Sequence, residues 1–114
     1  MTHGKSTLTK PRAPSDLLTV LGDPTRLAIL ERLRDSPMPV VEIARALPVS
    51  RPAVSQHLKV LKEAGLVKDR PEANRRIYSL DPSGLSPLMA YLDGFWRVAL
   101  ANYAIAARKR KKAR

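Results

Sequence analysis

The chain has 114 residues and a formal net charge of +11, with 44% hydrophobic residues and no cysteine. This length suits one domain, and the lack of cysteine excludes disulfides, thiolate nucleophiles and cysteine-ligated metal centres. No apolar run approaches the roughly 18 residues that span a bilayer, and residues 1–14 lack the apolar segment of a secretory signal. We therefore expect a cytoplasmic protein without a membrane anchor.

Most of the excess charge lies near the two ends of the chain. Residues 108–114 contain six of the 21 basic residues and residues 1–14 contain three, whereas all ten acids lie within residues 15–107. We expect a flexible arm over 1–14, one folded domain over 15–107 and a basic disordered tail over 108–114. Basic ends favour a nucleic-acid partner, although membrane surfaces and acidic proteins attract similar tails and such a tail can simply aid solubility.

Apolar residues at helical spacing predict four helices in the first half of the chain, over residues 15–21, 24–33, 40–47 and 51–64. Ser15 or Asp16 can cap the first helix, Asp23 the second and Ser50 the fourth, and Gly65 ends the fourth. The third and fourth helices are separated by only about three residues, which predicts a helix-turn-helix.

The second half of the chain predicts a β-hairpin and one long helix. Residues 66–70 and 76–80 have the pattern of short strands around a polar connection in which Asn74 can adopt a left-handed conformation. Ser86-Pro87 then predicts the start of a helix that reaches about residue 107. The expected fold is mainly α with a small β-hairpin, a winged helix-turn-helix of four helices, two strands and a fifth helix.

The fourth helix has two faces of different chemistry. Val54, Leu58 and Leu61 fall on its inward face, and small and polar residues fall on the outward face. Small residues let a helix N-terminus enter a major groove, amide and hydroxyl groups bond base edges, and lysines neutralise phosphates. Any exposed helix can carry such residues, but the position between a tight turn and a hairpin favours DNA recognition. The candidate DNA contacts here are Arg51, Pro52, Ser55, Gln56, Lys59 and Lys62.

Two arginines follow the turn of the predicted wing. Arg75 and Arg76 can place guanidinium groups in a minor groove or on its phosphates, although arginines at a hairpin are also common as solvated residues. We expect Tyr78 to pack against the helices rather than to stack on bases. We likewise expect His57 to pack at the edge of the core rather than to contact DNA.

The last predicted helix carries more apolar surface than so small a domain can cover. A second subunit would cover it, and two recognition helices are needed to span two half-sites; the alternative is a helix that folds back over its own domain. We therefore predict a homodimer. The candidate interface residues are Leu17, Leu18, Leu88, Leu92, Phe95, Trp96, Ala99, Leu100 and Tyr103.

Metal binding and catalysis receive little support from the sequence. His3 and His57 are the only histidines and lie far apart, and Asp93 has no histidine near it. There is no Ser–His–acid set at plausible spacing and no glycine-rich phosphate loop. We expect no cofactor, no metal and no enzymatic activity.

Four segments resemble the ArsR family of winged-helix repressors: LGDPTRLAIL at 21–30, VEIARAL at 41–47, SRPAVSQHLKVLKEAGLV at 50–67 and RRIYSLDPSGL at 75–85. The resemblance runs from about Leu17 to Tyr103. It implies a homodimer, joined through the first and last helices, that binds an inverted repeat in a promoter and represses transcription. It also places DNA contacts on the fourth helix and on the wing arginines named above.

The resemblance does not extend to the metal-sensing ligands of many relatives. The corresponding stretches are Glu42-Ile43-Ala44-Arg45-Ala46 and Asp93-Gly94-Phe95-Trp96-Arg97, which lack the usual cysteines and histidines. The chain is more similar to a metal-free branch of the family that shares the Phe-Trp pair. The inducer is unknown: a small organic ligand, a protein partner, or none.

Two other functions fit the same pattern. One is an RNA-binding or ribosome-associated basic module, because winged helices and basic tails occur there. The other is a protein-interaction winged helix whose polar face docks a partner. Binding to duplex DNA with a steep salt dependence would separate the predicted function from both.

Overall fold

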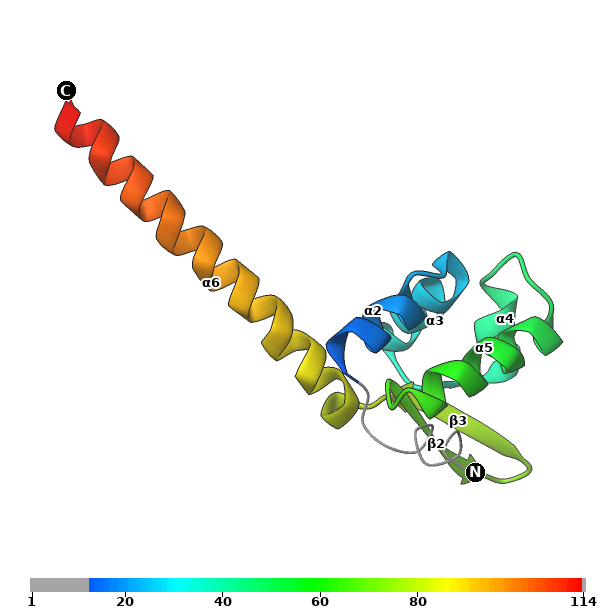
Figure 1. The fold of residues 1–114 in the computed structure, drawn as a ribbon. Helices are drawn as coiled ribbons and strands as arrows, with labels where there is room; N and C mark the ends of the chain where they lie inside the picture. Colours follow the sequence, from blue (N-terminus) through cyan, green and yellow to red (C-terminus); the bar gives the residue numbers. More distant parts are fainter. Residues whose placement is uncertain (1–12, 114) are drawn as a thin grey trace.

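The computed structural model describes residues 13–113, which form a winged-helix body and one long C-terminal helix (Figure 1). The predicted arm therefore lies almost wholly outside the described residues, as does His3. The described chain is mainly helical with a small antiparallel sheet, as predicted. In chain order the elements are α2 (Pro14–Leu21), α3 (Pro24–Asp35), β1 (Met38–Pro39), α4 (Val40–Arg45), α5 (Arg51–Glu63), β2 (Val67–Glu72), β3 (Arg75–Leu80) and α6 (Pro82–Ala113).

One hydrophobic core holds the body together. Leu17 of α2, Ile29 of α3, Ile43 of α4 and Leu58 of α5 are at most 1% exposed and belong to the same cluster. Each such side chain contributes roughly 1.5–3 kcal/mol by leaving water. Tyr78 packs against this cluster from the sheet, as expected. The core thus fixes α5 relative to the three preceding helices and leaves its opposite face to solvent.

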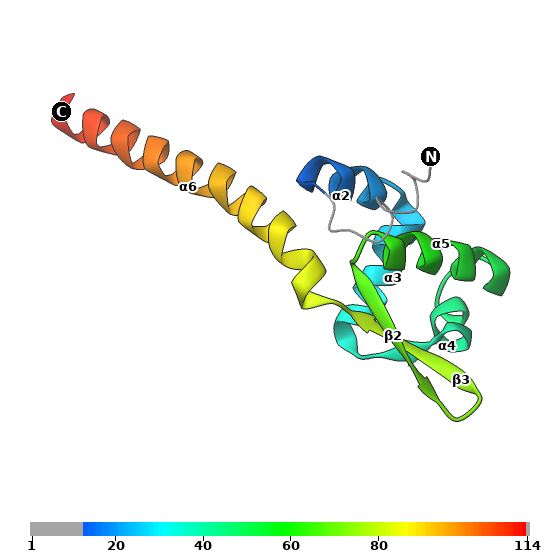
Figure 2. The same cartoon turned by 60° about the horizontal axis from the view of Figure 1, so that its bottom comes forward.

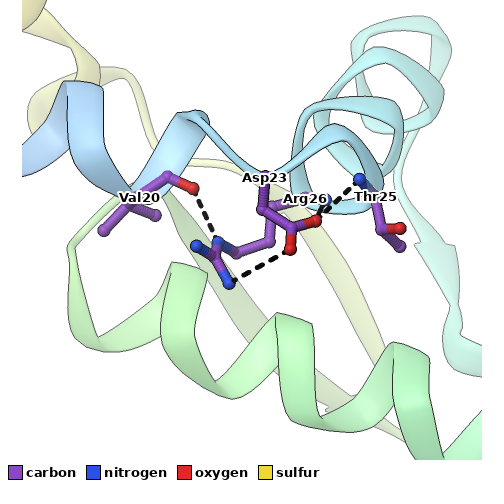
Figure 3. Close-up of polar contacts among 4 residues, drawn as sticks. All are labelled: Val20, Asp23, Thr25 and Arg26. Atoms are coloured by element: carbon purple, nitrogen blue, oxygen red, sulfur yellow. Dashed lines mark hydrogen bonds and ion pairs between the residues drawn. The ribbon is translucent and has the colours of Figure 1, made fainter.

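The junction between α2 and α3 depends on Asp23, which caps α3 as predicted (Figure 3). Its carboxylate accepts hydrogen bonds from the backbone N–H groups of Thr25 at 2.8 Å and Arg26 at 3.2 Å. The bond from the Arg26 N–H is the main cause of the lowered pKa of Asp23. The Arg26 side chain also donates from Nε to the Val20 carbonyl oxygen at 2.6 Å, so it ties the end of α2 to the start of α3.

The end of α5 is fixed by Gly65, as the sequence predicts. Gly65 has φ +81°, its N–H donates to the Lys62 carbonyl at 3.0 Å, and the N–H of Leu66 donates to the Leu61 carbonyl at 3.0 Å. This pattern is the Schellman motif, which satisfies the last carbonyls of a helix and favours glycine at the left-handed position. Gly84, near the start of α6, packs directly on this turn: a Cβ there would lie 1.5 Å from the Gly65 carbonyl oxygen.

The sheet differs from the predicted hairpin. A third strand, β1, pairs with β3, giving the order β1-β3-β2. The strand β2 runs through Pro71 to Glu72, so the connection is only Ala73-Asn74, and Ala73 rather than Asn74 has positive φ, at 57°. Strand β1 was not predicted from the sequence because two residues, Met38 and Pro39, are too few to show an alternating apolar pattern.

The first and last helices also depart from their predicted ends. Helix α2 starts at Pro14 after Ala13, and neither Ser15 nor Asp16 caps it. Helix α6 starts at Pro82, where the Asp81 carboxylate accepts from the Ser83 N–H at 3.1 Å, so Pro87 lies inside the helix. At the other end α6 runs through Ala113, whereas we predicted disorder over 108–114. Alanine and basic residues are good helix formers, and basic residues suit a helix C-terminus.

Candidate nucleic-acid interface

The outward face of α5 is the first part of the candidate interface. Ser50 caps the helix, and its Oγ accepts from the Ala53 N–H at 3.3 Å. Val54, Leu58 and Leu61 are at most 1% exposed, which confirms the predicted inward face. The predicted outward residues are all exposed: Arg51, Pro52, Ser55, Gln56, Lys59 and Lys62. His57 lies between the two faces and is half-buried, in keeping with the packing role we expected for it.

The turn before α5 positions this face. Helix α4 ends at Arg45, and residues 46–50 lead to the start of α5. The two helices pack against each other through the core, with Ile43 and Val54 both fully buried. The exposed side of α5 is therefore held by a rigid support, and no other described element covers the six residues named above.

The wing is the second part of the candidate interface. In the antiparallel pair of β2 and β3, Arg75 lies opposite Glu72 and Arg76 opposite Pro71. Both arginines are exposed. Arg76, however, is not free, because its Nε donates to the Asp69 carboxylate at 2.5 Å. Arg75 at the tip is thus the more available of the two predicted wing contacts.

Asp69 joins the wing to α5, and sequence reasoning missed this residue. Its side chain is only 4% exposed and also forms an ion pair with Lys62 Nζ at 2.8 Å. Burial opposes ionisation of Asp69, but hydrogen bonds from Lys62 and Arg76, together with their charges, leave its pKa below the ordinary value. Two predicted phosphate contacts, Lys62 and Arg76, are therefore paired within the protomer.

The predicted dimer residues divide into two groups. Leu17 and Leu88 are 1% and 5% exposed and pack where α2 meets α6, so they belong to the protomer core and the interface assignment was wrong for them. A periodic apolar pattern does not distinguish core from interface. The other predicted residues are exposed, Trp96 at 62%: Leu18, Leu92, Phe95, Trp96, Ala99, Leu100 and Tyr103.

Beyond its first turns, α6 extends away from the body (Figures 1 and 2). At 32 residues it is about 48 Å long, and residues 91–106 are exposed throughout. Tyr91 and Phe95 contact each other edge to face, with ring centroids 5.1 Å apart. So many exposed large apolar side chains on one projecting helix are unusual for the surface of a soluble monomer.

The two stretches that correspond to metal-sensing segments of relatives have structural roles in this protein. Asp93 pairs with Arg97 one turn further along α6, at 2.7 Å, and Ile43 is buried in the core. Among the residues that the structure describes, no group of three histidine, aspartate or glutamate side chains could hold a metal ion. None of the described helices is both long and apolar enough to cross a membrane.

The geometry defines a class of protein: a winged helix-turn-helix with an exposed polar recognition helix and a basic wing. Comparisons with known proteins agree. A family model described as a helix-turn-helix domain matches residues 21–70. The HTH-type transcriptional regulator Rv2034 of Mycobacterium tuberculosis is 59% identical over 93 residues, which cover 82% of this chain and 87% of the relative. The HTH-type transcriptional regulator NmtR of the same organism is 35% identical, covering 78% and 82%.

Solved structures give the same result. A possible transcriptional regulator for arsenical resistance is 46% identical with a TM-score of 0.64, covering 69% of this chain and 82% of that one. The homodimeric winged helix-turn-helix domain of Mb0332 from Mycobacterium bovis is 29% identical with a TM-score of 0.57, covering 69% and 73%. This chain belongs to the ArsR family of helix-turn-helix transcriptional regulators, and it is a DNA-binding regulator.

Proposed function

We propose that this protein is a transcriptional repressor that acts as a homodimer on an inverted-repeat operator. In this proposal α5 of each subunit enters a major groove, and the wing contacts the adjacent phosphates or minor groove. The observation that carries the proposal is the exposed polar face of α5, held from behind by buried Val54, Leu58 and Leu61. Repression is supported by relatives such as the transcriptional repressor SdpR of Bacillus subtilis, 30% identical over 81 residues.

Homodimerisation is supported by the exposed apolar surface of α6 and by the homodimeric Mb0332 domain. A subunit alone presents one α5, whereas a two-fold dimer presents two, as an inverted repeat requires. We propose that Leu18 and the exposed α6 residues form the interface. We further propose a cytoplasmic, nucleoid-associated protein that acts by binding alone, without catalysis, cofactor or metal inducer.

We expect different residues of α5 to recognise bases and to bind phosphates. With an operator selected from genomic fragments, Gln56→Ala should weaken operator binding by roughly 5- to 150-fold, because a bidentate base contact contributes about 1–3 kcal/mol of discrimination. The same change should leave random duplexes nearly unaffected. Lys59→Ala should weaken both duplexes by similar factors and reduce the salt slope by about one.

Fluorescence titration at several salt concentrations measures both quantities. Arg34→Ala is the matched control, because it removes an exposed positive charge from α3, which the proposal keeps away from DNA. Equal losses for Gln56→Ala on operator and random DNA would contradict the assignment. Preference of the parent protein for structured RNA at matched salt, or no binding to any duplex, would favour the RNA-binding or protein-interaction alternative.

A further inference from the structure

Asp69 links the two parts of the candidate DNA-binding surface, α5 and the wing, yet it carries the wrong charge for contact with DNA. Its side chain is 4% exposed and bonds one cation from each neighbouring element, Lys62 of α5 at 2.8 Å and Arg76 of β3 at 2.5 Å. The two cations are themselves about half exposed. Both therefore remain on the candidate DNA-binding surface, each bonded to the same carboxylate, which compensates one of their two positive charges.

This arrangement has two physical effects. A buried carboxylate bonded to both α5 and β3 restricts the angle between the recognition helix and the wing, because breaking either bond leaves a buried charge partly unpaired. The same bonds compete with phosphate for Lys62 and Arg76. Binding to random DNA depends on the number of phosphates neutralised, so each withheld cation lowers it.

We propose that Asp69 is a specificity-determining residue that withholds Lys62 and Arg76 from phosphates and holds the wing at a fixed angle to α5. The inference rests on the proposed operator binding. Random DNA then meets a surface with two fewer available cations per subunit. An operator whose groove matches the fixed angle loses less affinity, because contacts with its bases supply the remaining binding free energy.

Asp69→Asn tests the inference because the side chain keeps its shape and loses its charge. We expect it to raise affinity for random duplex, to steepen the salt slope by up to about 1.8 per subunit, and to lower the operator-to-random ratio. A merely structural role would lower affinity for both duplexes. Glu72→Gln is the matched control: it removes one exposed negative charge from the same wing without a bond to Lys62 or Arg76.

A second variant measures the competition directly. Lys62→Ala should cost little affinity for random duplex in the parent, where Asp69 holds the amine, and should cost a full phosphate contact in the Asp69→Asn background. If Asp69→Asn fails to fold, Lys62→Ala and Arg76→Ala in the parent still test whether Asp69 withholds these cations from DNA. In that case each substitution is expected to leave the salt slope nearly unchanged. A fall of about 0.9 for each would overturn the inference.

Two further outcomes of the titrations would overturn either the role of Asp69 or operator binding itself. A salt slope for Asp69→Asn equal to that of the parent or of Glu72→Gln would overturn the role of Asp69 while leaving operator binding intact. A parent protein that binds no duplex would overturn operator binding, and with it the role of Asp69. The two failures are therefore distinguishable in one set of titrations.

Discussion

Replacing Trp96 with aspartate is expected to convert the protein to monomers and to weaken operator binding by about 10²- to 10⁴-fold, the usual gain from linking two binding modules. Trp96 is 62% exposed in the protomer and lies among the exposed apolar residues of α6. Its substitution should therefore leave the protomer core intact. In the dimer the carboxylate would enter an apolar interface, where an unpaired buried charge is strongly unfavourable.

Sedimentation or size-exclusion chromatography with light scattering measures the first effect, and operator titration measures the second. Ala101→Asp is the matched control, because it adds the same charge to an exposed position of α6 about 140° around the helix from Trp96. A Trp96→Asp protein that remains a dimer would disprove the interface. Loss of the dimer in both variants would show that any charge on α6 is disruptive.

Gly84→Ala is expected to destabilise the protein by about 3 kcal/mol and to lower Tm by roughly 10 °C or more. The added Cβ would meet the Gly65 carbonyl oxygen at 1.5 Å, and this atom belongs to the backbone of the turn that ends α5. Neither partner can move as a flexible side chain would. Relief of the clash requires the start of α6 to shift away from the body.

Because α6 carries the proposed interface, this shift would also change the spacing of the two recognition helices. We expect Gly84→Ala to weaken operator binding more than binding to random duplex. Thermal unfolding at matched protein concentration, followed by circular dichroism, is the direct measurement. Ser86→Ala, at an exposed position two residues along α6, serves as the control. Equal Tm values for the two variants would show that the glycine contact is not restrictive.

The sequence predicted the recognition unit well because its signals are local. Asp23, Ser50 and Gly65 each act on backbone groups within a few residues, and the structure confirms all three roles. The inward and outward faces of α5 follow from helical spacing alone. Local chemistry and apolar periodicity therefore sufficed for the part of the fold that presents the candidate DNA contacts.

The missed features depend on contacts between distant segments. Met38 and Pro39 form a strand only because β3 lies beside them, opposite Tyr78 and Ile77. The pairing of Asp69 with Lys62 needs the packing of β2 on α5, and its pairing with Arg76 needs the pairing of β2 with β3. Pro87 is a good first residue of a helix, yet an earlier start at Pro82 is stabilised by Asp81 and by the contact of Gly84 with Gly65.

The most direct test of the central claim asks whether DNA covers the outward face of α5. The chain contains no cysteine, so Ser55→Cys introduces a single thiol on that face and Glu31→Cys introduces one on the exposed side of α3. With parent-like binding verified first, operator duplex should slow alkylation of the Ser55→Cys protein in proportion to the bound fraction and leave the Glu31→Cys protein unaffected. A thiol at position 55 that reacts equally fast in the free protein and in the duplex complex would contradict the account.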